Sequence, residues 1–274
     1  MPTLQIEHSL QLYYEDDDFT DPWRTAPVML LQHGFSRNGR FWYNWVPVLG
    51  GEFRILRPDM RGMGRSTVAE SHYEPSLDTF AADVRRLIDH LGVEQIVFVG
   101  ESFGGIIGLQ FAHTYPQRTR ALVLCNTPCR LPHGELRQRF SAGGDWDAAL
   151  ARGVAHWSTA TIDMRLDTRV APPGLKEWYI AEMDRTSPTI ARKLQAYLDT
   201  LDFHDHLKEI TVPTLLLVGA DTPTSPLEQQ QFMASQIPNC QLAVHPNLGH
   251  GINVLKPEWC AEHIRDFLAP ATKP

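Results

Sequence analysis

The sequence predicts an α/β protein: a mostly parallel eight-stranded sheet flanked by helices, with an inserted helical cap. Short apolar runs that end in Gly, Asn or Pro alternate with longer stretches of helical period, the order expected when helices cover both faces of a parallel sheet. A G-x-S-x-G pattern joins one apolar run directly to the next helix. The strand pattern then stops between residues 131 and 207.

Six buried strands are predicted from runs rich in Val, Leu, Ile and Phe. They span residues 28–31, 53–56, 95–99, 120–124, 213–218 and 241–244. Two earlier segments, residues 4–8 and 10–14, alternate apolar and polar side chains and predict an antiparallel hairpin at the edge of the sheet.

Two helices are predicted around the central strand. Residues 77–91 repeat apolar side chains at helical spacing, which predicts a helix. Gly92 follows at the position where a helix commonly ends with a residue in the left-handed conformation. A second helix begins at Ser102 and continues to Gln117, with Pro116 closing it.

The region from 131 to 207 has tryptophan, tyrosine and methionine residues in helix-compatible surroundings. We therefore expect a core domain of residues 1–130 and 208–274 and a helical cap of residues 131–207 over the carboxyl edge of the sheet. The aromatic side chains of the cap either pack against one another or face a ligand. Trp157 and Trp178 are the candidates for substrate contact.

Composition limits the function classes. The chain has 274 residues, 43% hydrophobic, which is enough for a substantial core. Its 25 Lys and Arg against 32 Asp and Glu give a net charge of −7, which argues against a nucleic-acid surface and favours small uncharged or apolar ligands. No apolar run approaches the roughly 18 residues that cross a bilayer, and no signal peptide is evident. We expect a cytoplasmic protein without membrane contact.

The four cysteines predict neither disulfides nor a metal site. No C-x-x-C pair occurs, and no cysteine has a histidine at zinc-finger spacing. They are typical of thiols in a reducing cytosol. No metal and no cofactor are expected.

Gly100-Glu101-Ser102-Phe103-Gly104 is the strongest motif. Small residues flank Ser102 because the chain turns from strand to helix within a few residues, which forces the serine into a strained conformation. The turn presents the hydroxyl at a helix N-terminus that favours developing negative charge. The alternative is a serine N-cap, but a cap needs no glycines on both sides after a buried strand.

With this motif the chain resembles the α/β-hydrolase family, in the serine-nucleophile branch that carries a helical cap. The likeness covers nearly the whole length. Its landmarks are His33-Gly34, residues 59–66, the Ser102 turn, the loop 219–226 and Gly249-His250-Gly251. Their order matches the family's order of serine, acid and histidine.

The resemblance implies a catalytic base and an acid. His250, flanked by glycines in the loop after the last strand, is the expected base that takes the proton of Ser102. Similar proteins place the acid at the position of Thr222, whereas this chain has Asp221 one residue earlier. Asp221 is the expected acid; Glu228 is the nearest alternative, and Asn126, where some relatives carry the acid, has no charge.

The resemblance also implies an oxyanion hole, formed by the backbone N–H groups of Phe103 and Phe35. His33 is then expected to organise the loop rather than act as a second base. In one interpretation Arg37 engages a carboxylate or carbonyl of the substrate; in the other it is exposed or pairs with acidic residues.

The expected function is that of a serine hydrolase. Relatives that open epoxides or displace halide carry Asp where this chain has Ser102, so those reactions are excluded. Hydrolysis of a carboxylic ester or lactone of a small to medium, largely apolar substrate is the first hypothesis. The alternatives are hydrolysis of a C–C bond in a vinylogous diketone, acyl transfer or perhydrolysis, and a non-catalytic small-molecule sensor of the same fold.

Overall fold

The computed structural model describes residues 2–131, 134–143 and 145–269. Its core is a sheet in which eight strands follow the order β1-β2-β4-β3-β6-β7-β8-β9, and a short ninth strand, β5, pairs with β2. This confirms the α/β class and the predicted eight strands and adds one. The strand bounds are β1 Thr3–Glu7, β2 Leu10–Asp17, β3 Val28–Gln32, β4 Arg54–Pro58, β5 Thr67–Val68, β6 Ile96–Glu101, β7 Thr119–Cys125, β8 Thr214–Gly219 and β9 Cys240–His245.

The strands from β4 through β3, β6, β7 and β8 to β9 run parallel. The hairpin of β1 and β2 is antiparallel, as predicted, and β2 also pairs antiparallel with β4, so the hairpin extends the main sheet. Because parallel strands end at the same edge, the loops after β3, β6, β8 and β9 meet there.

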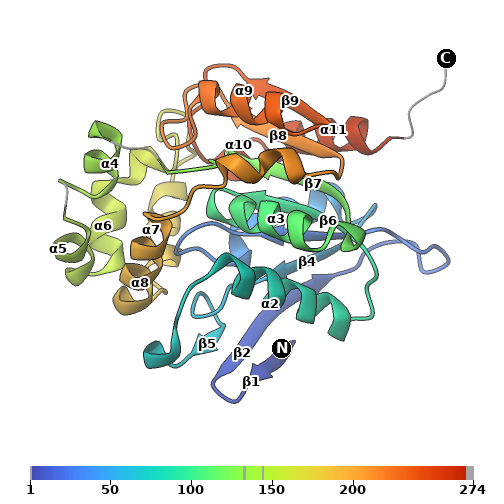
Figure 1. Cartoon of the computed structure of the whole chain (residues 1–274), viewed down its shortest axis with the longest axis horizontal. Helices are drawn as coiled ribbons and strands as arrows, with labels where there is room; N and C mark the ends of the chain where they lie inside the picture. Colours follow the sequence, from blue (N-terminus) through green and yellow to red (C-terminus); the bar gives the residue numbers. More distant parts are fainter. Residues whose placement is uncertain (1, 132–133, 144, 270–274) are drawn as a thin grey trace.

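Helices cover both faces of this sheet. Helices α2, Leu77–His90, and α3, Phe103–Thr114, pack side by side in front of it (Figure 1). Strand side chains alternate, so Leu30 and Phe98 face the cluster under α2 and α3, whereas Leu31 faces the opposite cluster. The other helices of the core are α1 Val46–Leu49, α9 Leu227–Gln236, α10 Ile252–Leu255 and α11 Pro257–Leu268.

In the described residues between β7 and β8, the structure has five α-helices: α4 Glu135–Phe140, α5 Trp146–Ala151, α6 Val154–Ala160, α7 Leu175–Met183 and α8 Pro188–Leu198. They form a separate group at one end of the sheet (Figure 1). The ring of Trp157 on α6 contacts Phe35 in the loop after β3, so this group covers the carboxyl edge. The boundaries of a core at 1–130 and 208–274 and a cap at 131–207 stay a prediction; residues 1, 132–133, 144 and 270–274 lie outside the described residues.

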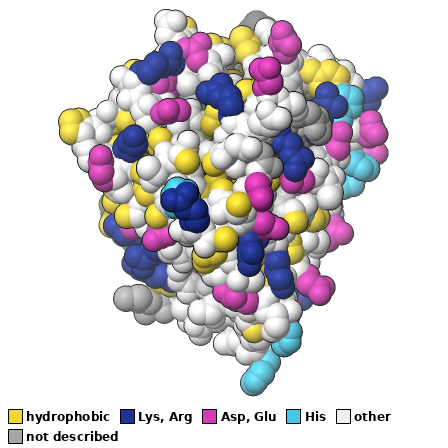
Figure 2. All heavy atoms as spheres, turned by 90° about the vertical axis from the view of Figure 1, so that its left-hand side faces the viewer, with side chains coloured by type: hydrophobic (Ala, Val, Ile, Leu, Met, Phe, Trp, Pro, Cys, Tyr) yellow, Lys and Arg dark blue, Asp and Glu magenta, His cyan; other side chains and the backbone are white. Residues whose placement is uncertain are grey.

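Short 3₁₀ helices complete the chain: η1 Gly39–Trp42, η2 Glu70–His72, η3 Pro116–Arg118, η4 Ile162–Met164 and η5 His204–Glu209. The face seen from the cap side carries basic, acidic and hydrophobic side chains intermixed (Figure 2). Among the described residues, no helix combines the length and the hydropathy needed to cross a membrane.

Candidate active site

Ser102 occupies the sharp turn between β6 and α3. Its backbone has φ 53° and ψ −121°, a conformation that residues other than glycine rarely adopt and that costs roughly 1–3 kcal/mol. Its N–H donates to the carbonyl oxygen of Cys125 (3.0 Å), which fixes the turn against β7. The serine is half-buried and stands at the N-terminus of α3, where unpaired N–H groups favour a negative charge. This position suits a nucleophile.

Close backbone approach explains the glycines around Ser102. A Cβ on Gly100 would overlap the carbonyl oxygen of Gly104, and a Cβ on Gly104 would overlap that of His33. A Cβ on Gly34 would lie 3.3 Å from the Cβ of Ser102. The loop after β3 therefore lies directly against the turn.

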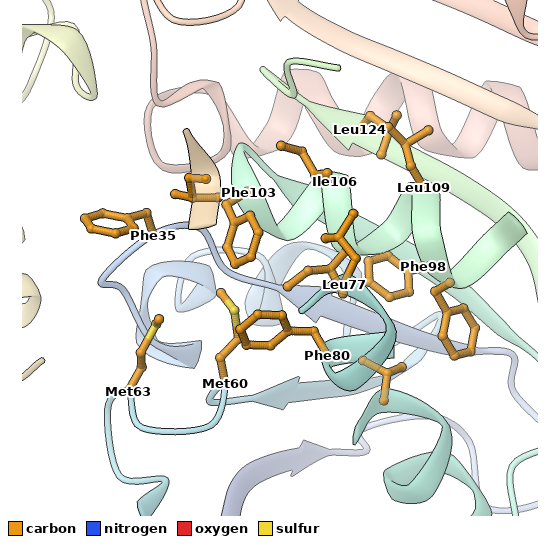
Figure 3. Packing of buried hydrophobic residues seen from close by; sticks show 14 of the residues in the cluster. Phe35, Met60, Met63, Leu77, Phe80, Phe98, Phe103, Ile106, Leu109 and Leu124 are labelled. Carbon is orange, nitrogen blue, oxygen red and sulfur yellow. The ribbon is translucent and has the colours of Figure 1, made fainter. Parts of the chain in front are cut away.

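The two expected oxyanion donors lie on these neighbouring segments. Phe103 is the first residue of α3, so its N–H has no acceptor within the helix. Its buried ring meets that of Phe80 edge to face, with 5.3 Å between centroids (Figure 3). The buried ring of Phe35 meets Trp157 in the same way, also at 5.3 Å. The rings anchor both segments, and the role of their N–H groups stays a prediction.

His33 organises the loop after β3. Its Nδ1 lies 2.9 Å from the carbonyl oxygen of Gly34, and its Nε2 accepts the N–H of Met60 at 2.9 Å. Both bonds require the neutral ring with its proton on Nδ1. Burial lowers the pKa of His33 to about 4, so the ring stays neutral at pH 7.

His250 lies in the loop after β9 and is only 1% exposed. Its Nδ1 lies 2.9 Å from the hydroxyl oxygen of Thr222 and 2.8 Å from that of Thr224. These two buried hydroxyl groups occupy the side of the ring where a carboxylate was expected. A hydroxyl group either donates or accepts, so it does not by itself fix the tautomer of the ring as a carboxylate does.

The structure corrects the expectation that Asp221 orients His250. The Asp221 side chain is 44% exposed, and its carboxylate accepts a hydrogen bond from Arg169 at 2.9 Å. The next residue, Thr222, points inward to the ring, so the loop holds its neighbour Asp221 outside. Glu228 lies in the first turn of α9, as the sequence indicated.

Glu101, which directly precedes Ser102, is the carboxylate that reaches His250. It is fully buried and paired with Arg37. Its Oε1 lies 2.9 Å from Nε2 of His250, although the contact is not aligned as a hydrogen bond. The histidine therefore lies beside the residue adjacent to Ser102.

The charges of this cluster influence one another. Burial raises the pKa of Glu101, but the charge of Arg37 and the contact with His250 outweigh it, so the pKa lies below its usual value. Burial lowers the pKa of His250; Glu101 opposes this, while Arg37 and Arg165 add to it. His250 is consequently neutral at pH 7, as a base must be.

Sequence reasoning missed Glu101, Thr222 and Thr224 as site residues. Glu101 was within the G-x-S-x-G motif but occupies a position where the pattern accepts any residue. Thr222 stands at the position where relatives carry the acid, and this position was the sequence signal that could have indicated its contact with His250.

The three candidates for substrate contact lie in different surroundings. Arg37 is buried and paired with Glu101. Trp157 is buried against Phe35 and so borders the predicted oxyanion loop. Trp178 instead lines a separate surface cavity of about 380 Å³ with Arg40, Tyr43 and residues 172–175.

One group of described residues has the donor types of a metal site. His113, at the end of α3, lies with His206 and Glu209 of η5, and their ligand atoms are all within 4.8 Å of one another. His206 and Glu209 are about half exposed. This group shares no residue with the Ser102 site.

Comparison with known proteins shows the family of the chain. The family model of the alpha/beta hydrolase fold matches residues 27–257. A Serratia proteamaculans protein named "Putative carbamate hydrolase RutD" is 30% identical over 251 residues, 85% of this chain and 87% of that protein. A thermophilic esterase from Thermogutta terrifontis is 30% identical with a TM-score of 0.80, over 97% of this chain and 96% of the esterase. The structure of a Pseudomonas aeruginosa hydrolase has a TM-score of 0.85 and 25% sequence identity, over 98% of both chains. These relatives support a hydrolase, and the chain belongs to the alpha/beta hydrolase fold family.

Proposed function

We propose that this hydrolase cleaves carboxylic esters, including lactones, of small molecules through an acyl-enzyme on Ser102. The observation that carries the proposal is the conformation of Ser102: a strained turn at a helix N-terminus, against the loop of Phe35 and next to the residue that contacts His250. The 30% identity with a thermophilic esterase supports the same reaction.

In the proposed reaction, Oγ of Ser102 attacks the carbonyl carbon while Nε2 of His250 takes its proton. The N–H groups of Phe35 and Phe103 stabilise the oxyanion. His250 then returns the proton to the oxygen of the leaving alcohol, and the C–O bond breaks. Water attacks the acyl-enzyme with the same proton transfers and releases the acid.

His250 accepts a proton on Nε2 only when its Nδ1 carries the other proton. In that tautomer the Nδ1–H donates to the hydroxyl oxygens of Thr222 and Thr224. Glu101, 2.9 Å from Nε2, stabilises the imidazolium that forms. This division of roles replaces the single acid of the usual triad, with Arg37 holding Glu101 ionised.

The test is turnover of a p-nitrophenyl ester by the wild type and by Ser102→Ala. Steady turnover that Ser102→Ala lowers by about 10⁴-fold or more supports the proposal. Ser141→Ala, a buried cap serine that bonds only the backbone of Gln138 in the described structure, is the control and should retain activity.

A non-catalytic sensor is the second candidate, because hydroxyl groups rather than a carboxylate face Nδ1 of His250. Equal background rates in the wild type and Ser102→Ala would favour it. A panel of esters, lactones, carbamates and vinylogous diketones then ranks the enzyme substrates; carbamates belong in it because relatives are named for them.

A further inference from the structure

Arg165 is a buried cation that has no carboxylate partner among the residues that the structure describes. It follows η4 and is 2% exposed. Its guanidinium donates to the hydroxyl of Thr161 (2.6 Å) and to the carbonyl and hydroxyl oxygens of Ser158 (3.0 and 3.2 Å), and its Nε has no hydrogen-bond partner in the described part of the chain. No carboxylate of that part lies within 4.0 Å of the guanidinium. A buried charge is costly unless an opposite charge faces it.

The buried charges around Ser102 do not balance. Arg37 and Arg165 are cations, Glu101 is the one buried carboxylate that pairs with either of them among the described residues, and His250 is neutral at pH 7. These four groups together therefore carry one excess positive charge, and the buried carboxylate of Asp167 nearby is already paired with Arg169. A ligand anion would neutralise it.

Arg165 borders the catalytic loops. Its Cζ lies 4.0 Å from the centroid of the Trp157 ring, whose edge meets Phe35 of the predicted oxyanion loop. The backbone of Arg165 lies near the loop of His250, since a Cβ on Gly251 would lie 3.4 Å from the carbonyl oxygen of Arg165. The guanidinium itself lies over the rings of Trp157 and Phe140 in the cap, and its charge lowers the pKa of His250.

We infer that Arg165 binds a carboxylate of the substrate, so that the preferred esters are those of molecules that bear a second, free carboxylate. A guanidinium suits this role because its planar donors match the two oxygens of a carboxylate. This inference rests on the proposed function for the reaction, but the binding of an anion does not depend on turnover.

The inferred preference differs from the sequence-based expectation of a largely apolar substrate. The chain's net charge of −7 argued for uncharged ligands, whereas Arg37, Arg165, Glu101 and His250 together carry a positive charge. Local charge decides recognition in a closed site, because buried charges are little screened by solvent.

Binding is tested by titration calorimetry in Ser102→Ala protein, which cannot turn the ligand over. The two ligands are monomethyl glutarate and methyl glutaramate, in which an uncharged amide replaces the free carboxylate. The carboxylate should bind at least 10-fold more tightly than the amide. Adding Arg165→Met should abolish that preference, whereas adding Arg152→Met, at an exposed cap arginine, should preserve it. Equal binding of both ligands, or an undiminished preference in Arg165→Met, would overturn the inference.

Arg165→Lys is the second variant, for the case that Arg165→Met does not fold. It keeps the charge but loses the planar donors. The ratio of the affinity for the carboxylate ligand to that for the amide ligand should therefore fall but stay above one.

Experiments on the wild type separate this inference from the proposed reaction. Ser102-dependent turnover of p-nitrophenyl acetate that glutarate does not inhibit overturns the carboxylate site alone; carboxylate binding at Arg165 without Ser102-dependent turnover overturns the reaction alone.

Discussion

His250 illustrates how a single residue decides the chemistry of this site. Its Nδ1 meets Thr222 and Thr224, and its Nε2 meets Glu101. The sequence indicated His250 and Ser102 as candidates from their motifs, because each motif has a physical requirement for neighbouring glycines. It could not identify the acid, because a shift of one residue in a loop reverses which side chain points inward, and no spacing rule gives that direction.

Restoring a carboxylate at Thr222 should increase activity. In Thr222→Asp, the new carboxylate faces Nδ1 of His250, fixes the tautomer and stabilises the imidazolium, so kcat/KM for a p-nitrophenyl ester should rise about 10-fold or more at pH 8. The same charge should raise the pKa of His250. In the wild type, burial holds the pKa of His250 below its usual value, so activity falls only at acidic pH; in the variant the fall should begin at a higher pH.

Thr222→Asn is the matched control, since it has the size of aspartate without its charge. It should leave the pH profile near that of the wild type. A folded Thr222→Asp protein with lower activity and an unshifted acid limb would contradict the assignment of Thr222 to the position of the acid.

Strand β6 and helix α3 show why most secondary-structure elements could be predicted. The sequence has a strong signal where β6 ends and α3 begins: apolar strand residues, then a turn with glycines, then helical periodicity. The cap was predictable only as helical, because its short helices α4 to α8 pack through contacts distant in sequence, such as that of Trp157 with Phe35. The substrate side of the cap, including Arg165, carried no motif.

Helix α3 packs so closely against the end of β3 that adding one methyl group to α3 should lower the free energy of unfolding strongly. Gly104→Ala would place a Cβ into the carbonyl oxygens of Gln32 and His33, so the free energy of unfolding should fall by about 3 kcal/mol. Gly51→Ala, where a Cβ meets no atom within 4 Å, is the control and should change it by less than about 0.5 kcal/mol. Urea denaturation measures both; equal stability of the two variants would contradict the packing argument.

At the scale of the whole molecule, Asp167 joins the cap group to the core. Its carboxylate accepts the N–H of Gly249 at 2.7 Å, and its own N–H donates to the carbonyl of His250 at 2.9 Å. The segment that holds Arg165 therefore also holds the loop of His250, the proposed base. Cap position and base position are coupled through these two bonds.

Loss of this connection should reduce catalysis without unfolding the core. Asp167→Ala removes the acceptor for Gly249, so kcat/KM should fall about 10-fold and the amide of Gly249 should exchange with deuterium faster. Asp167→Asn keeps an acceptor oxygen and should recover most of the activity. Identical exchange in Asp167→Ala and the wild type would show that the cap does not hold the loop.

Formation of a covalent acyl-enzyme on Ser102 can be measured by intact-protein mass spectrometry after rapid mixing with a p-nitrophenyl ester. We expect a mass increase of one acyl group, located on the peptide that contains Ser102 and absent in Ser102→Ala. Ester turnover by the wild type with the label on another residue, or an equal label in Ser102→Ala, would contradict the proposed acyl-enzyme.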